Sequence, residues 1–389
     1  MNKNKTIYLD HAATTYVRPE VIKAMEPYWA EKYGNPSSLY SKGREAKAAI
    51  ETARQQIANV FNCQPTEIIF EGSGTESDNH AIIGTALANK SRGNHIITSA
   101  IEHHAVLHAC EFLETQGFEV TYLPVDKEGI VKLEELEKAI RPETILVSIM
   151  FANNEIGTIQ PIHEIAKTLK RKNKDILFHT DACQAAGYYE LKVDELGVDL
   201  MTINGSKIYG PKGTGALYVR KGVIINPFVH GGGQEKGKRA GTENVAGIVG
   251  LATALELAQK EQVKEAERLI KLRDSLIQKL LQIPKVVLNG HATKRLPNNV
   301  NVTIKDIEGE AMLLHLDEKG ICCSTGSACT SGSLDPSHVI LALGLPYEMA
   351  HGSIRFSLGH CNSEKDIEYL MEVFPPIIEK LRAMSPVKL

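Results

Sequence analysis

The chain has 389 residues, of which 43% are hydrophobic and 23% charged, and its formal net charge is -3 at pH 7. These values exclude the strongly basic surface of a nucleic-acid binder, and no apolar run approaches the roughly 20 residues that span a bilayer. The seven cysteines are an odd number without a C-x-x-C pair, so they do not predict a disulfide framework. Because the polar first residues contain no signal-peptide core, we expect a cytoplasmic protein whose cysteines act as thiols.

From about residue 68 onward, short apolar runs alternate with amphipathic stretches. The patterns at 133–140 and 162–171 predict helices. Near-continuous apolar strands between helices predict a mostly parallel sheet with helices on both faces. The seven expected strands cover residues 68–70, 95–98, 120–123, 144–149, 176–179, 198–203 and 215–219.

The pattern changes after about residue 250, where a long charged helix is expected at 252–281. We predict an α/β fold in which a large domain over residues 16–255 packs closely against a smaller α+β domain formed by residues 1–15 and 256–389. The elements expected after the long helix are a strand at 300–304, a helix at 310–319, a strand at 353–357 and a closing helix from residue 363.

Lys207 lies between an expected strand and the glycine-rich run 210–215. The carboxyl ends of sheet strands are where α/β proteins bind ligands. A lysine amine forms Schiff bases with carbonyls, which is how pyridoxal phosphate (PLP) is anchored. The alternative is a surface lysine beside a turn, and the run lacks the G-x-x-x-x-G-K-[ST] spacing of a P-loop.

Two further strand ends carry residues that suit the same cofactor. Asp181 follows an apolar strand, and a buried aspartate needs a cation such as a protonated pyridine nitrogen. A helix N-cap is the alternative for Asp181. Gly74 and Thr75 lie between a strand and a helix, where backbone N–H groups and hydroxyls bind phosphate, although Gly-Ser turns are common.

A histidine pair and an arginine are the next candidates. His103 and His104 follow a strand end, where an imidazole either stacks on a cofactor ring or bonds to the backbone at a helix start. Arg355 lies inside an expected strand. On a buried face it suits a substrate carboxylate, whereas on an edge strand it faces solvent.

Cys329 stands in the run 324–333, which consists almost wholly of small and polar residues. Such a run contributes little to a core, so we expect a mobile loop, at about 322–334, that carries a reactive thiol. Cys322 and Cys323 precede it in strand-like sequence and are expected to be structural. We expect no resident metal; the alternative is a metal or cluster bound by these two cysteines with Cys329.

Together these motifs resemble the cysteine desulfurases, which belong to the class-V aminotransferases among the PLP-dependent transferases of fold type I. The resemblance extends over nearly the whole chain, with the motifs in the family's order. The motifs that carry it are 8–15, 34–38, 74–77, 153–157, 207–213, 239–242, 324–331 and 354–358.

The resemblance implies a role for each cofactor-binding residue. Lys207 would carry PLP and move the substrate proton, Asp181 would pair with the pyridinium nitrogen, and Gln184 would contact the phenolic oxygen. His103, rather than His104, would stack on the ring and act in catalysis. The phosphate would be held by Gly74, Thr75, Asn204, Ser206 and, from the partner subunit, Thr242.

One departure from the family's pattern concerns the phosphate site. Many relatives have a histidine directly before the lysine and often a serine three positions before it, where this chain has Ser206 and Asn204. Both can bond to phosphate, but an imidazole is lost.

The implied reaction converts L-cysteine to L-alanine, with Asn154 and Arg355 binding the substrate carboxylate and Cys329 becoming a persulfide. The implied partners are a second copy of the chain and a sulfur acceptor, such as an iron–sulfur scaffold or a tRNA-thiolation protein; neither a nucleic acid nor a membrane is expected to bind directly. The long run around Cys329 resembles the iron–sulfur and thio-tRNA branch. The alternatives are a selenocysteine lyase or another class-V PLP enzyme, and a catalytically silent scaffold that binds a sulfur-relay partner.

Overall fold

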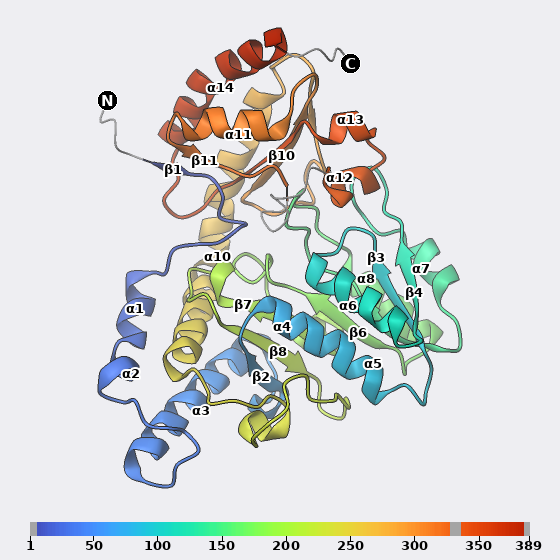
Figure 1. The fold of residues 1–389 in the computed structure, drawn as a ribbon, viewed down its shortest axis with the longest axis vertical. Helices are drawn as coiled ribbons and strands as arrows, with labels where there is room; N and C mark the ends of the chain where they lie inside the picture. Colours follow the sequence, from blue (N-terminus) through green and yellow to red (C-terminus); the bar gives the residue numbers. More distant parts are fainter. Residues whose placement is uncertain (1–5, 327–335, 385–389) are drawn as a thin grey trace.

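The large unit is built on a seven-stranded sheet in the order β2-β8-β7-β6-β5-β3-β4. The structure is a computed structural model and describes residues 6–326 and 336–384 (Figure 1). All strands run in one direction except β8, which is antiparallel to both neighbours. The seven expected strands are confirmed, although β6 and β7 begin and end later in the sequence than predicted. Their bounds are β2 (Ile68–Glu71), β3 (His95–Ser99), β4 (Glu119–Leu123), β5 (Thr144–Ser148), β6 (Leu177–Asp181), β7 (Leu200–Asn204) and β8 (Gly215–Val219).

Helices cover both faces of this sheet because its strands bury residues on both sides. Successive residues enter different cores: Leu146 packs on one face and Val147 on the other, and Leu200 alternates with Met201 in the same way. One core includes α3 (Ser41–Phe61), α7 (Leu133–Ala139), α8 (Ile162–Lys172) and α9 (Val193–Leu196). The other includes α6 (His104–Thr115) and the continuous helical run of α4 (Gly74–Asn79), η2 (His80–Gly84) and α5 (Thr85–Ala88).

The smaller unit has a core of its own, formed around a three-stranded antiparallel sheet in the order β12-β10-β9. The first strand of the chain, β1 (Ile7–Tyr8), joins this unit by pairing in parallel with β11 (Ile321–Cys322). The remaining elements of the unit are β9 (Val286–Leu288), β10 (Asn299–Ile304), β12 (Ser353–Ser357), α11 (Gly309–Asp317), α12 (His338–Ala342), α13 (Tyr347–Ala350) and α14 (Glu364–Met384).

The long helix α10 (Val245–Leu280) packs in two cores: the core of the large unit that contains α3, and the core of the smaller unit. It packs in the first through Leu255 and in the second through Leu276. It begins at Val245 instead of the expected residue 252, because the Asn244 side chain accepts a hydrogen bond from the Gly247 N–H (3.0 Å) and caps the helix there. The remaining short elements are α1 (Pro19–Met25), which packs in the first core through Val21 and Met25, α2 (Pro27–Ala30), η1 (Pro65–Glu67), η3 (Gly205–Lys207) and η4 (Gln234–Gly237).

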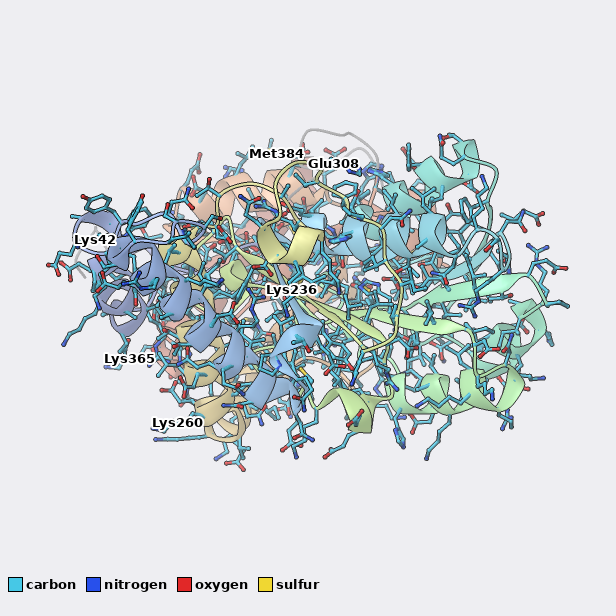
Figure 2. The ribbon with its side chains drawn as sticks, turned by 90° about the horizontal axis from the view of Figure 1, so that it is seen from below. Lys42, Lys236, Lys260, Glu308, Lys365 and Met384 are labelled. Atoms are coloured by element: carbon cyan, nitrogen blue, oxygen red, sulfur yellow. The ribbon has the colours of Figure 1, made fainter. Side chains whose placement is uncertain are left out.

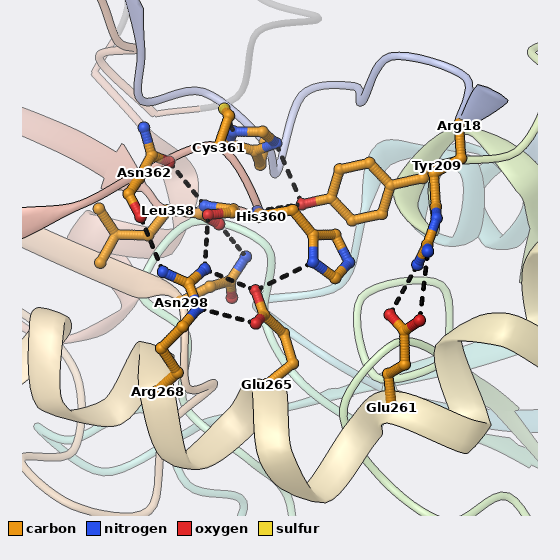
Figure 3. Close-up of polar contacts among 12 residues, drawn as sticks. Arg18, Tyr209, Glu261, Glu265, Arg268, Asn298, Leu358, His360, Cys361 and Asn362 are labelled. Carbon is orange, nitrogen blue, oxygen red and sulfur yellow. Dashed lines mark hydrogen bonds and ion pairs between the residues drawn. The ribbon is translucent and has the colours of Figure 1, made fainter.

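A polar network joins α10 to loops of both units (Figure 3). Arg268 donates to the Gly359 carbonyl (2.9 Å), and Glu265 lies 3.3 Å from Nδ1 of His360. The backbone N–H of His360 donates to the Tyr209 hydroxyl (2.9 Å). Since Tyr209 lies two residues after Lys207, the network connects the turn that carries this lysine with the chain that follows β12.

The outer surface carries the charged side chains that the composition supplies. Lys42 at the start of α3 and Lys260 on α10 are exposed and point away from the cores (Figure 2). Over residues 6–326 and 336–384, no helix has the length and apolarity needed to cross a membrane.

A buried ion pair fastens α3 to the loop that precedes α10. Arg54 donates from two nitrogens to the two carboxylate oxygens of Glu235 (2.7 Å each), and the side chains are 7% and 3% exposed. Replacing Glu235 by alanine would leave the Arg54 guanidinium buried without this partner. We expect Glu235→Ala to lower the free energy of unfolding by about 3–5 kcal/mol, measured as a lower urea midpoint.

The exposed pair of Arg141 and Glu119 is the matched control for this change. The side chains are 41% and 61% exposed, so Glu119→Ala is expected to cost less than about 1 kcal/mol. Equal losses in the two variants would contradict the expectation for Glu235.

Candidate active site

A cavity of about 240 Å³ lies at the carboxyl ends of β6 and β7, where the loops of the large unit meet Arg355 of the small unit. Thr242 is exposed and does not line this cavity, and Cys329 lies outside the described residues. The residues predicted from the sequence that do line it are Gly74, Thr75, His103, Asn154, Asp181, Gln184, Asn204, Ser206, Lys207 and Arg355.

Lys207 is the last residue of η3, directly after the strand β7. Its Nζ donates to the Ala13 carbonyl (2.5 Å), so the amine lies inside the cavity and the surface-lysine alternative is wrong. The turn after it is tightly held. Tyr209 has a left-handed backbone (φ 61°), and its N–H donates to Oγ1 of Thr15 (2.9 Å). These contacts fix the direction from which the lysine enters the cavity.

Two carboxyl groups form the floor of the cavity. Asp181 ends β6, and its Oδ1 accepts a hydrogen bond from the Cys183 N–H (2.8 Å), so the carboxylate supports the following turn as well as facing the cavity. Asp78 on α4 was not predicted. Burial, followed by the neighbouring charge of Asp181, raises the pKa of the Asp78 carboxyl well above its usual value. The two carboxyl groups therefore interact unfavourably when both are charged, and a cation bound beside them would reduce this cost.

Small residues and hydroxyls gather at the start of α4. Ser73 caps this helix by accepting a hydrogen bond at Oγ from the Glu76 N–H (3.0 Å). A Cβ at Gly74 would lie 2.9 Å from both Asn204 Nδ2 and Cys183 Sγ, so the chain has room for glycine alone here. The N–H groups of a first helical turn have no intrahelical acceptor. Together with the Ser206 hydroxyl, they make a donor set that suits a phosphate group.

His103 and Gln184 lie on the walls. His103 is the N-cap of α6, and its Nδ1 accepts a hydrogen bond from the Ala105 N–H (3.1 Å). The alternative, a bond to the backbone at a helix start, is therefore observed, and stacking on a cofactor ring stays a prediction; in the neutral ring the proton stands on Nε2. The ring of His104 instead lies near that of His338, with a centroid distance of 4.8 Å. Gln184 donates to the Ala12 carbonyl (3.0 Å).

Arg355 lies on the edge strand β12, yet its side chain is only 1% exposed. It donates to Asp10 Oδ1 (2.8 Å) and to the Asn154 carbonyl (2.9 Å), while its Nε is buried without a described partner. The solvent-facing alternative is therefore wrong. A buried donor with no acceptor is unfavourable, and an incoming carboxylate would satisfy it.

Some residues that line the cavity were not predicted from the sequence. Ala12 and Ala13 line it and accept hydrogen bonds through their carbonyls, although they belong to a motif that already supported the family resemblance. Asp78 follows Gly74 by four residues, which on a helix places both on one face. That spacing was the available signal for Asp78.

Comparison with known proteins identifies the family. The aminotransferase class-V family model matches residues 7–370. The cysteine desulfurase IscS of Methanosarcina thermophila is 58% identical over 384 residues, which cover 99% of this chain and 95% of that protein. The chain belongs to the cysteine desulfurases.

Solved structures share the fold of this cysteine desulfurase. A NifS-like protein has a TM-score of 0.92 at 40% identity, covering 97% of this chain and all of that one. The structure described as SspA in complex with cysteine has a TM-score of 0.81 at 37% identity, covering 91% of this chain and 99% of that one.

Class-V cysteine desulfurases depend on pyridoxal phosphate, and this desulfurase has residues that fit the cofactor. One cavity contains the Lys207 amine, the carboxyl groups of Asp78 and Asp181 that suit a cation, and hydrogen-bond donors beside Gly74. Lys207 would bind the aldehyde, Asp181 the ring nitrogen, and Gly74, Thr75 and Ser206 the phosphate. The alternative metal site at Cys322, Cys323 and Cys329 lies partly outside the described residues.

Proposed function

We propose that the protein transfers the sulfur of L-cysteine to its own Cys329 and releases L-alanine. The observation that carries this proposal is the cavity in which Lys207 and Asp181 face the buried guanidinium of Arg355. The substrate is an amino acid, so it needs a group that takes up its amine and a cation for its carboxylate. The relative described as bound to cysteine supports the same choice of substrate.

In this proposal the residues of the cavity bind the substrate and move its proton. Bound PLP supplies an electron-withdrawing ring that stabilises negative charge on the substrate carbon beside the amine. The Lys207 amine takes the proton from that carbon, and Asp181 keeps its partner nitrogen protonated. Arg355 and Asn154 hold the carboxylate and thereby fix the direction in which the substrate sulfur points.

The sulfur step balances in atoms and electrons. The thiolate of Cys329 forms a bond to the substrate sulfur while the carbon–sulfur bond breaks, and its electron pair stays with the carbon. That carbon takes up a proton and leaves as part of alanine. The outer sulfur of the Cys329 persulfide then passes to an acceptor thiol by exchange.

The Cys329 assignment distinguishes this function from its alternatives. After addition of cysteine, mass spectrometry of the proteolysed enzyme is expected to find one additional sulfur on the peptide that contains Cys329. A selenocysteine lyase without sulfur transfer, or a silent scaffold, would give alanine or no product with that peptide unmodified. The intact set of Lys207, Asp181 and Arg355 argues against a scaffold.

The proposed acceptor is an iron–sulfur scaffold or a tRNA-thiolation protein, and the proposed compartment is the cytoplasm. Cys110 and Cys183 are buried free thiols. Free thiols persist in a reducing compartment. An acceptor that carries a thiol also needs that environment to remain competent for exchange.

We also propose a homodimer. Between residues 16 and 40 several large apolar side chains are exposed, among them Trp29 (65%), Tyr33 (69%) and Leu39 (89%). Such concentrations of apolar surface mark contacts with partners. Thr242, exposed and away from its own cavity, suits the expected contact with a partner's phosphate.

The dimer proposal predicts that Trp29→Asp together with Leu39→Asp shifts sedimentation from the dimer towards the monomer, because two charges would be buried at the contact. Leu314→Asp on α11 changes an equally exposed side chain (65%) of the small unit and is expected to leave the dimer intact. A wild-type chain that sediments as a monomer would contradict the proposal.

A further inference from the structure

Residues on both sides of segment 327–335 lie next to the same atom, Oε2 of Glu155. Ser337, which follows the segment, donates from Oγ to Oε2 of Glu155 (2.5 Å). Gly326, which precedes it, lies against the same oxygen: a Cβ at Gly326 would be 3.2 Å from Glu155 Oε2 and 3.6 Å from the Cβ of Ser337. The carboxylate of Glu155 therefore lies beside both Gly326, the last residue before the segment, and Ser337, which follows it.

Each of these ends is also attached to an element that carries active-site residues. Before the segment, Ser324 and Arg355 exchange backbone hydrogen bonds (3.2 and 2.6 Å). After it, Nε2 of His338 donates to the carbonyl of Glu102 (3.0 Å), the residue before His103. The chain before the segment is thus bonded to Arg355, and the chain after it is bonded to the residue that precedes His103.

The Glu155 side chain is not needed to hold its own turn. The backbone of Glu155 is already fixed, because its N–H donates to Asn153 Oδ1 (2.8 Å) and its carbonyl accepts from Nδ2 of Asn299 (3.0 Å) and Asn301 (3.1 Å). Its carboxyl group is nevertheless buried, and burial raises its pKa. A buried carboxyl group is unfavourable unless its hydrogen bonds compensate, and the bond described for it reaches Ser337.

We propose that Glu155 is a positioning residue for sulfur transfer, which fixes both ends of segment 327–335 relative to Asn154 and Arg355. The inference rests on the proposed role of Cys329. Since Cys329 follows Gly326 by three residues, covalent geometry keeps its Cα within about 11 Å of the Gly326 Cα. The Ser324–Arg355 backbone pair before the segment and the Ser337–Glu155 bond after it fix the residues from which the thiol is tethered, and fixed ends would raise its effective concentration at the substrate.

The test compares Glu155→Ala with Glu155→Gln in the PLP-loaded enzyme. Mass spectrometry follows the rate of persulfide formation on Cys329 in a single turnover, and the cofactor absorbance follows cysteine binding. Glu155→Ala is expected to slow persulfide formation by about 10- to 100-fold, with half-saturation by cysteine changed by less than about twofold. Glu155→Gln keeps an acceptor oxygen for Ser337 and is expected to restore most of the rate.

Ser337→Ala supplies an independent measurement, because it removes the other partner of the same hydrogen bond. Combined with Glu155→Ala, it is expected to add little further loss, as for two residues that act through one contact. Glu190→Ala, at an exposed surface pair with Lys192, is the control and is expected to match the wild type.

Two results would overturn the inference. One is an unchanged rate of persulfide formation in Glu155→Ala. The other is an equal loss of cofactor binding, cysteine binding and persulfide formation, which would make Glu155 a structural support of the turn. Failure of the proposed function looks different, because the wild-type enzyme itself would then carry no additional sulfur on Cys329.

Discussion

Lys207→Ala is expected to reduce sulfide release from cysteine by at least about 1,000-fold, because it removes both the cofactor anchor and the base that moves the substrate proton. Wild-type enzyme should show a cofactor absorbance that borohydride bleaches into a stable protein adduct, and the variant should show no adduct. Alanine and sulfide are measured together, since their loss in parallel indicates a defect before the carbon–sulfur bond breaks.

Lys212 offers a matched control for that experiment. Its Nζ donates to the Thr15 carbonyl (2.8 Å), much as Lys207 donates to Ala13, but Lys212 is exposed and does not line the cavity. Lys212→Ala is expected to keep sulfide release within about threefold of the wild type, as for a surface change away from the chemistry. Substantial turnover in Lys207→Ala would show that another amine holds the cofactor.

Cys329→Ala is expected to lower the rate of sulfide release by at least about 100-fold, while the cofactor absorbance and its response to cysteine remain. The reason is that an alanine methyl group has no electron pair to attack the substrate sulfur, whereas a thiolate is a strong nucleophile. This separation of substrate binding from turnover is the expected mark of a residue that acts after the substrate is bound.

Cys361→Ala tests whether the thiol effect is specific. Cys361 is exposed, and its Sγ lies 3.5 Å from Nε2 of His11, so it is a second solvent-accessible cysteine against which specificity can be tested. Its replacement is expected to leave sulfide release unchanged. Loss of turnover in Cys361→Ala, with turnover kept in Cys329→Ala, would show that Cys361 accepts the sulfur and that the Cys329 assignment is wrong.

The sequence predicted most of the fold because its signals are local. Apart from the half-exposed edge strand β4, each sheet strand contributes to two cores, so its existence could be recognised without knowledge of its neighbours. The beginning of α10 was predicted too late, since its first turns are apolar and uncharged, and the Asn244 cap gave the only local signal. Boundaries of this kind depend on a single side-chain contact.

The active site was predictable where a residue follows a strand end, as Lys207 and Asp181 do. It was less predictable where the function of a side chain depends on a distant partner. Arg355 bonds to Asp10, which lies 345 residues away in the sequence. This contact turns the Arg355 side chain inward although its strand is at the edge of the sheet. Asp78 and Glu155 were missed because a carboxyl group in a polar stretch of sequence gives no indication of burial.

The helix α10 has a consequence for how the molecule loses its structure. Its residues from Leu251 to Ala258 complete the first core, and those from Leu269 to Leu280 complete the second. If either core melted, the helix would lose part of its packing, and the other core would lose a wall in turn. We therefore expect the two cores that share α10 to unfold as one cooperative unit.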